Sequence, residues 1–137
     1  MESLTPPQET KQAGYLVESI ILLESTFKRG ISDLKNFDIQ GGINIETQHT
    51  ETSPENKFTV IVSMTYSGMH NETEIISAFI KMSGVYEKYG EPIIPDEKFK
   101  AINAPAIIYP FIRELLYNNC LRAGITNVFL PTINFKP

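Results

Sequence analysis

The sequence has few of the residues on which disulfides, metal sites and nucleophilic catalysis depend. Its 137 residues include one cysteine, two histidines and no tryptophan. One cysteine excludes an intramolecular disulfide, and a lone thiol is typical of a protein kept in a reducing compartment. We therefore expect a cytoplasmic protein in which Cys120 is a small core or interface residue rather than a nucleophile.

The scarcity of histidine and cysteine also bears on metal binding and catalysis. Structural metal sites need these residues clustered at short spacing, and His49, His70 and Cys120 do not provide such a cluster. The sequence has no phosphate-binding glycine-rich loop, and nothing in it indicates a Ser-His-Asp triad. It therefore predicts no metal, no cofactor and no enzymatic activity.

Positive charge and long apolar runs are lacking as well. The net charge of -4 argues against non-specific nucleic-acid binding, which needs a basic surface. No apolar run approaches the roughly 20 residues of a membrane-spanning helix, and the first residues lack the pattern of a secretory signal. A hydrophobic content of 42% is typical of a globular chain. We expect residues 1–18 to form a flexible tail and residues 19–137 to form one domain.

Residues 19–86 carry the two-residue alternation of apolar side chains that is typical of β-strands. Short connections between the last three strands imply antiparallel pairing. Gly41-Gly42 is predicted to mark a turn or bulge, and Ser83-Gly84 a bulge or bend. The predicted strands are 19–29, 43–50, 58–66 and 73–86, with a turn at 54–56, a hairpin over 67–72 and a long connection over 87–102.

Residues 103–122 are the only long stretch with helical periodicity. Asn103 is predicted to cap the helix, Pro105 fits its first turn, and Gly124 follows its last turn. Pro110 removes one helical hydrogen bond, so we expect it to kink the helix or to delay its regular part. The fold class is therefore α+β, a four-stranded antiparallel sheet followed by one long helix packed on it.

One face of this helix is apolar, because its large side chains recur at steps of three and four residues. A sheet or a second copy of the chain must cover that face. The residues that we expect at an interface between copies are Ile108, Ile112, Leu115, Leu116 and Asn119.

Aromatic residues are numerous despite the missing tryptophan, with 8 Phe and 6 Tyr. Each of them alone is better explained as a core residue contributed by a loop. Together with a single helix they indicate more apolar surface than one chain can bury, which predicts an oligomer interface or a binding groove. The residues concerned are Phe37, Tyr109, Phe111, Phe129 and Phe135.

The helix also carries a motif. Its residues 106–114, Ala-Ile-Ile-Tyr-Pro-Phe-Ile-Arg-Glu, resemble the Asn-Ile-Leu-Phe-Pro-Tyr-Ala-Arg-Glu run of the SecB export chaperones. Residues 131–135, Pro-Thr-Ile-Asn-Phe, are similar to that family's Pro-Val-Asn-Phe ending, and Arg122-Ala123-Gly124 is similar to its Arg-Gly pair. Gly84-Val85-Tyr86 is similar to a Gly-Ile-Phe of the family. The resemblance covers residues 19–135.

This resemblance implies an ATP-independent chaperone that holds unfolded or extended polypeptide in apolar grooves and takes part in protein export. It implies a dimer of dimers, in which helices pack between two eight-stranded sheets. The expected partners are non-native polypeptides and other copies of the chain, with no nucleic acid and no membrane insertion. The implied client groove contains Phe37, Ile39, Ile43, Ile45, Tyr109, Phe111 and Phe135.

Departures from the family favour a second hypothesis. Glu24 matches one acidic residue that SecB presents to the motor protein SecA, but Lys28 reverses a second and Phe79 replaces a third. Losing these carboxylates removes charge complementarity, which argues against docking to SecA. The family also continues past the Asn-Phe motif into a second helix and an acidic tail, which we expect this protein to lack. The alternative is a chaperone dedicated to one client or toxin, as in antitoxin-type relatives.

A third and weaker hypothesis is a small-molecule-binding or enzymatic α+β domain. It requires a closed, polar-lined pocket, which the sequence does not predict.

Overall fold

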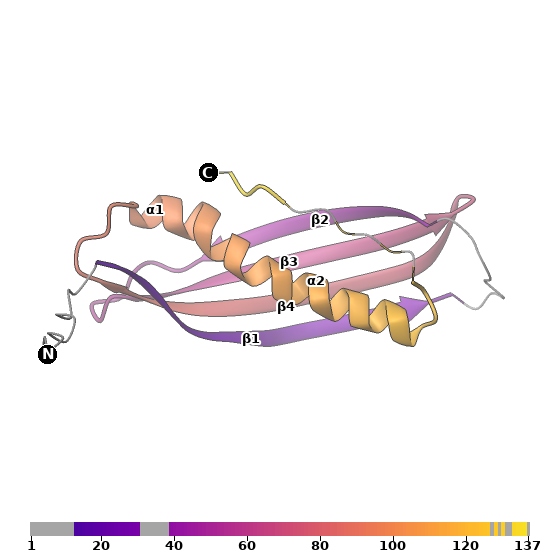
Figure 1. The fold of residues 1–137 in the computed structure, drawn as a ribbon, viewed down its shortest axis with the longest axis horizontal. Coiled ribbons are helices and arrows are strands. Elements are labelled where there is room, and N and C mark those ends of the chain that lie inside the picture. The colour runs from indigo at the N-terminus through magenta and orange to yellow at the C-terminus, as the bar shows by residue number, and fades with distance from the viewer. Residues whose placement is uncertain (1–12, 31–38, 127, 129, 131–132, 137) are drawn as a thin grey trace, which may run out of the picture.

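The structure is a computed structural model that describes residues 13–30, 39–126, 128, 130 and 133–136. Within these residues, four strands precede a long helical segment that lies across one face of the sheet (Figure 1). The predicted α+β class is confirmed. The elements are β1 (Gly14–Arg29), β2 (Gln40–His49), β3 (Lys57–His70), β4 (Thr73–Tyr89), α1 (Asp96–Lys98), the π-helical turn η1 (Phe99–Asn103) and α2 (Ala104–Arg122).

The four strands form one antiparallel sheet in the order β1-β4-β3-β2. The two central strands, β3 and β4, are joined by a tight turn at Asn71 and Glu72, both of which have positive φ angles of 48° and 65°. Two such residues are typical of the hairpin turn that matches the twist of the flanking strands. The predicted hairpin is therefore present, but Gly68 lies within β3 rather than in the turn. β1 and β2 are left as the two edges of the sheet.

Two glycines in this sheet make room for aromatic rings. Neither predicted bulge is present. Gly41-Gly42 and Ser83-Gly84 pair with their neighbours in unbroken register. A Cβ atom on Gly41 would lie 2.6 Å from the Tyr66 hydroxyl oxygen, and one on Gly84 would lie 2.9 Å from the Tyr86 ring. The register shifts fall instead in β1, at Val17/Ser19 and Leu22/Glu24, and at Gly68/Met69. β1 also starts at Gly14, before the predicted residue 19.

The helical segment begins earlier than expected. Asn103 has helical angles (φ -73°, ψ -46°) and caps nothing, because α1 and η1 precede it from Asp96 onward. The predicted connection over 87–102 is thus helical in its last part. The sequence signal for this earlier start was Pro95, which has an extended conformation, followed by two acidic residues. Their carboxylates lie in the first helical turn, where they interact favourably with the helix dipole.

α2 runs from Ala104 through Pro110, so the proline does not delay its regular part, and it ends at Arg122, as predicted. Its end is a Schellman motif, in which Gly124 has a φ of 77° and the N–H of Ile125 donates to the Cys120 carbonyl at 2.8 Å. No helix among the described residues is both long enough and apolar enough to cross a lipid bilayer.

The core lies between α2 and the inner faces of β3 and β4. Ile108, Ile112 and Leu116 are fully buried there, against the chain's own sheet. Their assignment to an interface between copies is therefore corrected: no part of these side chains remains free to contact a second copy. Leu115 and Asn119 are half-buried. The core residues with no exposed surface are Val60, Val62, Met64, Ile76, Ile80, Tyr86, Ala104, Ile108, Ile112 and Leu116.

Candidate functional site

After the turn at Gly124 the chain reverses and runs back alongside α2 (Figure 1). We call residues 125–136 the C-terminal arm. The backbone N–H of Leu130 donates to the Tyr117 hydroxyl oxygen at 2.7 Å, and that hydroxyl lies 3.3 Å from the Leu130 carbonyl, to which it donates. Farther along the arm, the Phe135 ring meets the Tyr109 ring edge-on, with centroids 6.2 Å apart. Since Tyr109 precedes Tyr117 on the helix, the arm runs antiparallel to α2.

The arm binds mainly through apolar side chains. Ile125 and Leu130 are buried, and Val128, Ile133 and Phe135 are half-buried against the core. The described residues of the arm form neither helix nor strand. The surface beneath it therefore accommodates an irregular polypeptide segment with apolar side chains at short intervals.

A cavity of about 430 Å³ lies between the last turns of α2 and the beginning of the arm. Burial raises the pKa of the Cys120 thiol to about 11, so this side chain is a neutral, apolar part of the cavity wall. Its buried position confirms the prediction of a core cysteine. The residues that line the cavity are Tyr117, Cys120, Leu121, Ile125, Thr126 and Val128.

Of the predicted client-binding residues, the structure brings Tyr109 and Phe135 into contact. Phe111 is not on the same surface: Tyr109 is buried, whereas Phe111 is 46% exposed on the outer side of α2, because residues two apart do not share a helix face. Phe37 lies outside the described residues, as does Phe129.

The other predicted client residues lie in or before β2. Ile43 and Ile45 pair with the buried Tyr66 and Met64, so they share the helix side of the sheet. Both are half-buried, as is Ile39 just before the strand.

The edge strand β1 carries an apolar surface that the sequence analysis did not single out. Leu22 is paired with Met82 on the helix side of the sheet, and Ile21 is paired with Ser83 on the outer side. Both are about half exposed, as are Leu16 and Leu23. Four consecutive apolar residues at 20–23 were the available indication, because such a run predicts cover on both faces of a strand.

Glu24, Lys28 and Phe79 lie on the outer face of the sheet, away from α2. Glu24 pairs with Lys81, Lys28 with Ser77, and Phe79 with Thr26. The positions proposed for motor docking therefore share one face, and a lysine and a phenyl ring stand there beside the remaining carboxylate.

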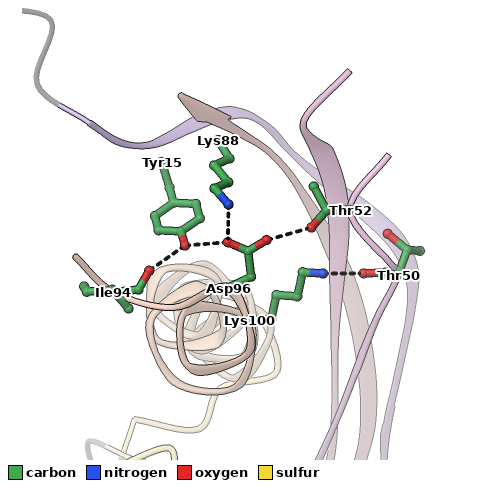
Figure 2. Close-up of polar contacts among 7 residues, drawn as sticks. All are labelled: Tyr15, Thr50, Thr52, Lys88, Ile94, Asp96 and Lys100. Atoms are coloured by element: carbon green, nitrogen blue, oxygen red, sulfur yellow. Dashed lines mark hydrogen bonds and ion pairs between the residues drawn. The ribbon is translucent and has the colours of Figure 1, made fainter. Parts of the chain in front are cut away.

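A polar network fixes the beginning of the helical segment against the end of the sheet (Figure 2). The Asp96 carboxylate accepts hydrogen bonds from Tyr15 at 2.9 Å and Thr52 at 3.1 Å, and it pairs with the Lys88 ammonium at 3.2 Å. Partial burial acts to raise the pKa of Asp96, but these hydrogen bonds outweigh it, so the pKa lies below its usual value. Burial, reinforced by the Asp96 charge, raises the pKa of Tyr15 to about 12.

Aromatic rings and a buried lysine complete this end of the molecule. The Tyr15 and Phe99 rings stack with centroids 3.8 Å apart. Lys100 is 2% exposed; its ammonium donates to the Thr50 carbonyl at 3.0 Å and lies 4.9 Å from the centre of the Phe58 ring. Sequence reasoning missed this cluster, because its members come from β1, β3, β4, the loop after β2 and the helical segment. We refer to Tyr15, Thr50, Thr52, Phe58, Lys88, Asp96, Phe99 and Lys100 as the anchor cluster.

No group of three or more His, Cys, Asp or Glu side chains suited to a metal ion occurs in the described part of the chain. The two histidines lie apart, His49 at the end of β2 with its Nε2 atom 3.6 Å from a Glu97 oxygen, and His70 at the end of β3.

Comparisons with known proteins agree with this architecture. The family described as "Preprotein translocase subunit SecB" matches residues 32–137. The SecB protein of Halorhodospira halophila is 26% identical over 97 residues, which are 71% of this chain and 56% of that protein. An uncharacterized protein of Methanocaldococcus jannaschii is 29% identical over 103 residues, 73% of this chain and 66% of that protein. The chain thus spans less than two thirds of the length of these two relatives.

Among solved structures, a SecB-like chaperone of Mycobacterium tuberculosis in complex with a ChAD peptide from the HigA1 antitoxin has a similar fold. The TM-score is 0.68 at 14% sequence identity, and the match covers 88% of each chain. The sheet, the long helix with its internal proline and the family match over most of the sequence lead to one conclusion. The chain belongs to the SecB family, of which it is a divergent member.

Proposed function

We propose that this protein is an ATP-independent chaperone that holds unfolded or extended polypeptide against the apolar side of α2. Family membership supports this function, and the observation that carries it is the C-terminal arm, an irregular apolar segment already seated along the helix. Apolar burial is non-directional, so such a surface accepts many side-chain combinations. Holding a polypeptide in this way needs no catalytic group and no cofactor.

The test is the refolding of a slowly folding client protein in the presence of this chain. A near-stoichiometric amount should delay refolding, because bound segments are withdrawn from the folding chain. If several unrelated clients refold at their normal rates, the general chaperone function is excluded.

A second candidate function is a chaperone dedicated to one partner and not coupled to SecA. The outer face of the sheet supports it, because Lys28 and Phe79 accompany Glu24 there. The complex of the Mycobacterium tuberculosis relative with an antitoxin peptide offers a precedent for such a partner. Cross-linking in the cytoplasm, where we place the protein, should then capture one main partner, whereas capture of many unrelated nascent chains would favour the general function and export.

We also infer that a second copy covers β1. This edge strand exposes Leu16, Ile21, Leu22 and Leu23, and its outer backbone groups face no strand of the described chain. Unprotected apolar edge strands pair readily with other strands. Pairing of two β1 strands would cover the exposed apolar side chains and would also satisfy the outer backbone groups. Light scattering should give a dimer or a dimer of dimers, and Leu22→Glu should lower that mass. A monomeric wild-type protein would contradict the assembly.

A further inference from the structure

We propose that the C-terminal arm is a resident substitute for the client, and that an extended client segment displaces it from Tyr117. This inference rests on the proposed chaperone function and makes it more specific. The ligand that the surface fits is an extended polypeptide stretch with large apolar side chains at short intervals. At least one of its residues has a free backbone N–H and C=O to place against the Tyr117 hydroxyl.

Tyr117 provides the first argument, because it recognises main chain rather than a particular side chain. Its hydroxyl accepts the N–H of Leu130 at 2.7 Å and donates to the C=O of the same residue at 3.3 Å. A hydroxyl has one donor and two acceptor positions, so both bonds form together. Any residue other than proline can offer the same pair of groups, and a client segment can therefore replace Leu130 without a sequence requirement.

The way in which the arm is attached provides the second argument. Its root is fixed by the helix cap, where the Ile125 N–H donates to Cys120. Beyond that point, the hydrogen bonds that join described arm residues to the body are the pair at Tyr117. The described residues of the arm also make apolar contacts: Phe135 packs against Tyr109, and Ile125 and Leu130 are buried in the core. Each of these contacts is of a kind that a client segment can supply in exchange.

The cavity beside Tyr117 provides the third argument. An open cavity of about 430 Å³ beside Ile125 and Val128 leaves room for apolar side chains larger than those that the described arm residues place there. A segment with larger apolar side chains would make contacts there that the arm does not make. Displacement then adds apolar contacts that the described arm residues do not make, and in the absence of a client the arm covers the apolar surface.

The first experiment measures client affinity with the full chain and Phe135→Ala. The probe is reduced, carboxymethylated α-lactalbumin, a permanently unfolded protein, labelled for fluorescence anisotropy. If the arm competes with the client, loss of the Phe135 ring weakens the arm alone, and binding tightens by roughly threefold to tenfold. If the arm is instead a fixed wall of the groove, the same substitution weakens binding and overturns the proposal. Phe79→Ala is the matched control, because Phe79 is a half-buried ring on the opposite face of the sheet.

The second experiment needs no variant. Amide hydrogen exchange at Leu130 should accelerate about tenfold or more when the unfolded client is added, because the bond to Tyr117 is released. The Ile125 amide, which belongs to the helix cap, should keep its protection and serves as the internal control. Unchanged or slower exchange at Leu130 in the bound state would overturn the arm proposal while leaving the chaperone function intact.

The two proposals fail in different ways. If neither the wild-type chain nor Phe135→Ala binds the unfolded probe, both the chaperone function and the displacement of the arm are excluded. If the wild type fails to bind and Phe135→Ala binds, the arm covers the client surface but a client does not displace it, and the displacement proposal is overturned.

Discussion

The two ends of the helical segment are held in different ways. At its beginning, the anchor cluster combines the stacked rings of Tyr15 and Phe99 with polar contacts. The Asp96 carboxylate has three partners, and the buried Lys100 donates to the loop after β2 (Figure 2). At its end, the C-terminal arm is held by the helix cap at Ile125, the Tyr117 hydroxyl and apolar packing, beside an open cavity. The polar contacts among the described residues are thus concentrated at the beginning of the helical segment, and we expect the end beside the arm to open more readily.

The largest expected contrast comes from removing one phenyl ring from the anchor cluster and one from the C-terminal arm. Phe99→Ala should lower the free energy of unfolding by about 3–5 kcal/mol, because Phe99 is buried and packs on Tyr15, Phe58 and Tyr86. Phe135→Ala should cost about 1 kcal/mol or less, since its ring is only half-buried and belongs to the arm, outside the packed sheet and helix. Urea unfolding measures both. Equal losses would show that the C-terminal arm is as firmly held as the anchor cluster.

Acid should loosen the anchor end first. The pKa of Asp96 is lower in the folded chain than in the unfolded one, so its contribution to stability is present above the unfolded value of about 4 and is lost as the pH falls through the folded value. Thermal unfolding between about pH 7 and about pH 3 should show this loss. Asp96→Asn should reduce the slope, whereas Glu46→Gln, at an exposed position of β2, should leave it unchanged.

A substitution in the β3–β4 turn, at the same end of the molecule as the tip of α2, should strengthen that end. Glu72 has a φ of 65°, which strains any residue that carries a Cβ atom, and Glu72→Gly should therefore raise the free energy of unfolding by about 0.5–1 kcal/mol. Asn71→Gly provides the comparison. It should gain less, because asparagine tolerates positive φ. Chemical denaturation of both variants decides the order.

The smallest effect concerns local opening without a change in global stability. Cys120 is buried in the cavity wall and its pKa is raised to about 11, so a thiol reagent should label it slowly near neutral pH. Tyr117→Phe removes both bonds to Leu130 and should accelerate labelling while the unfolding midpoint changes little. Labelling that accelerates only as the whole protein unfolds would indicate that the arm end does not open separately.

The repeating patterns of the sequence predicted the elements well. Alternation located the four strands, and a helical period together with Gly124 located the end of α2, because these depend on local geometry. Asn103 was assigned wrongly as a cap, since a π-helical turn joins α1 to α2 and no local pattern announced it. Ile108, Ile112 and Leu116 were identified as an apolar face but assigned to the wrong partner. An apolar stripe requires burial without specifying what buries it.

The candidate site was predictable only in part. The aromatic residues Tyr109 and Phe135 were recognised, and the structure places them together. Tyr117 was not recognised, because its hydroxyl bonds to the backbone of Leu130, 13 residues later in the chain, and no local pattern indicates that contact. The anchor cluster was missed for the same reason: Tyr15 and Asp96 are separated by 81 positions.

By itself, the sequence determined the fold class of this protein, because periodic apolar patterns specify strands and a helix. The motif around Pro110 also revealed its resemblance to the SecB family. Only the tertiary structure decided which surfaces are covered and by what. It turned one face of α2 toward the chain's own sheet, left β1 exposed, and laid the C-terminal arm on Tyr117. The physical reason is that hydrophobic burial is non-directional, whereas the choice of partner depends on contacts between residues far apart in the chain.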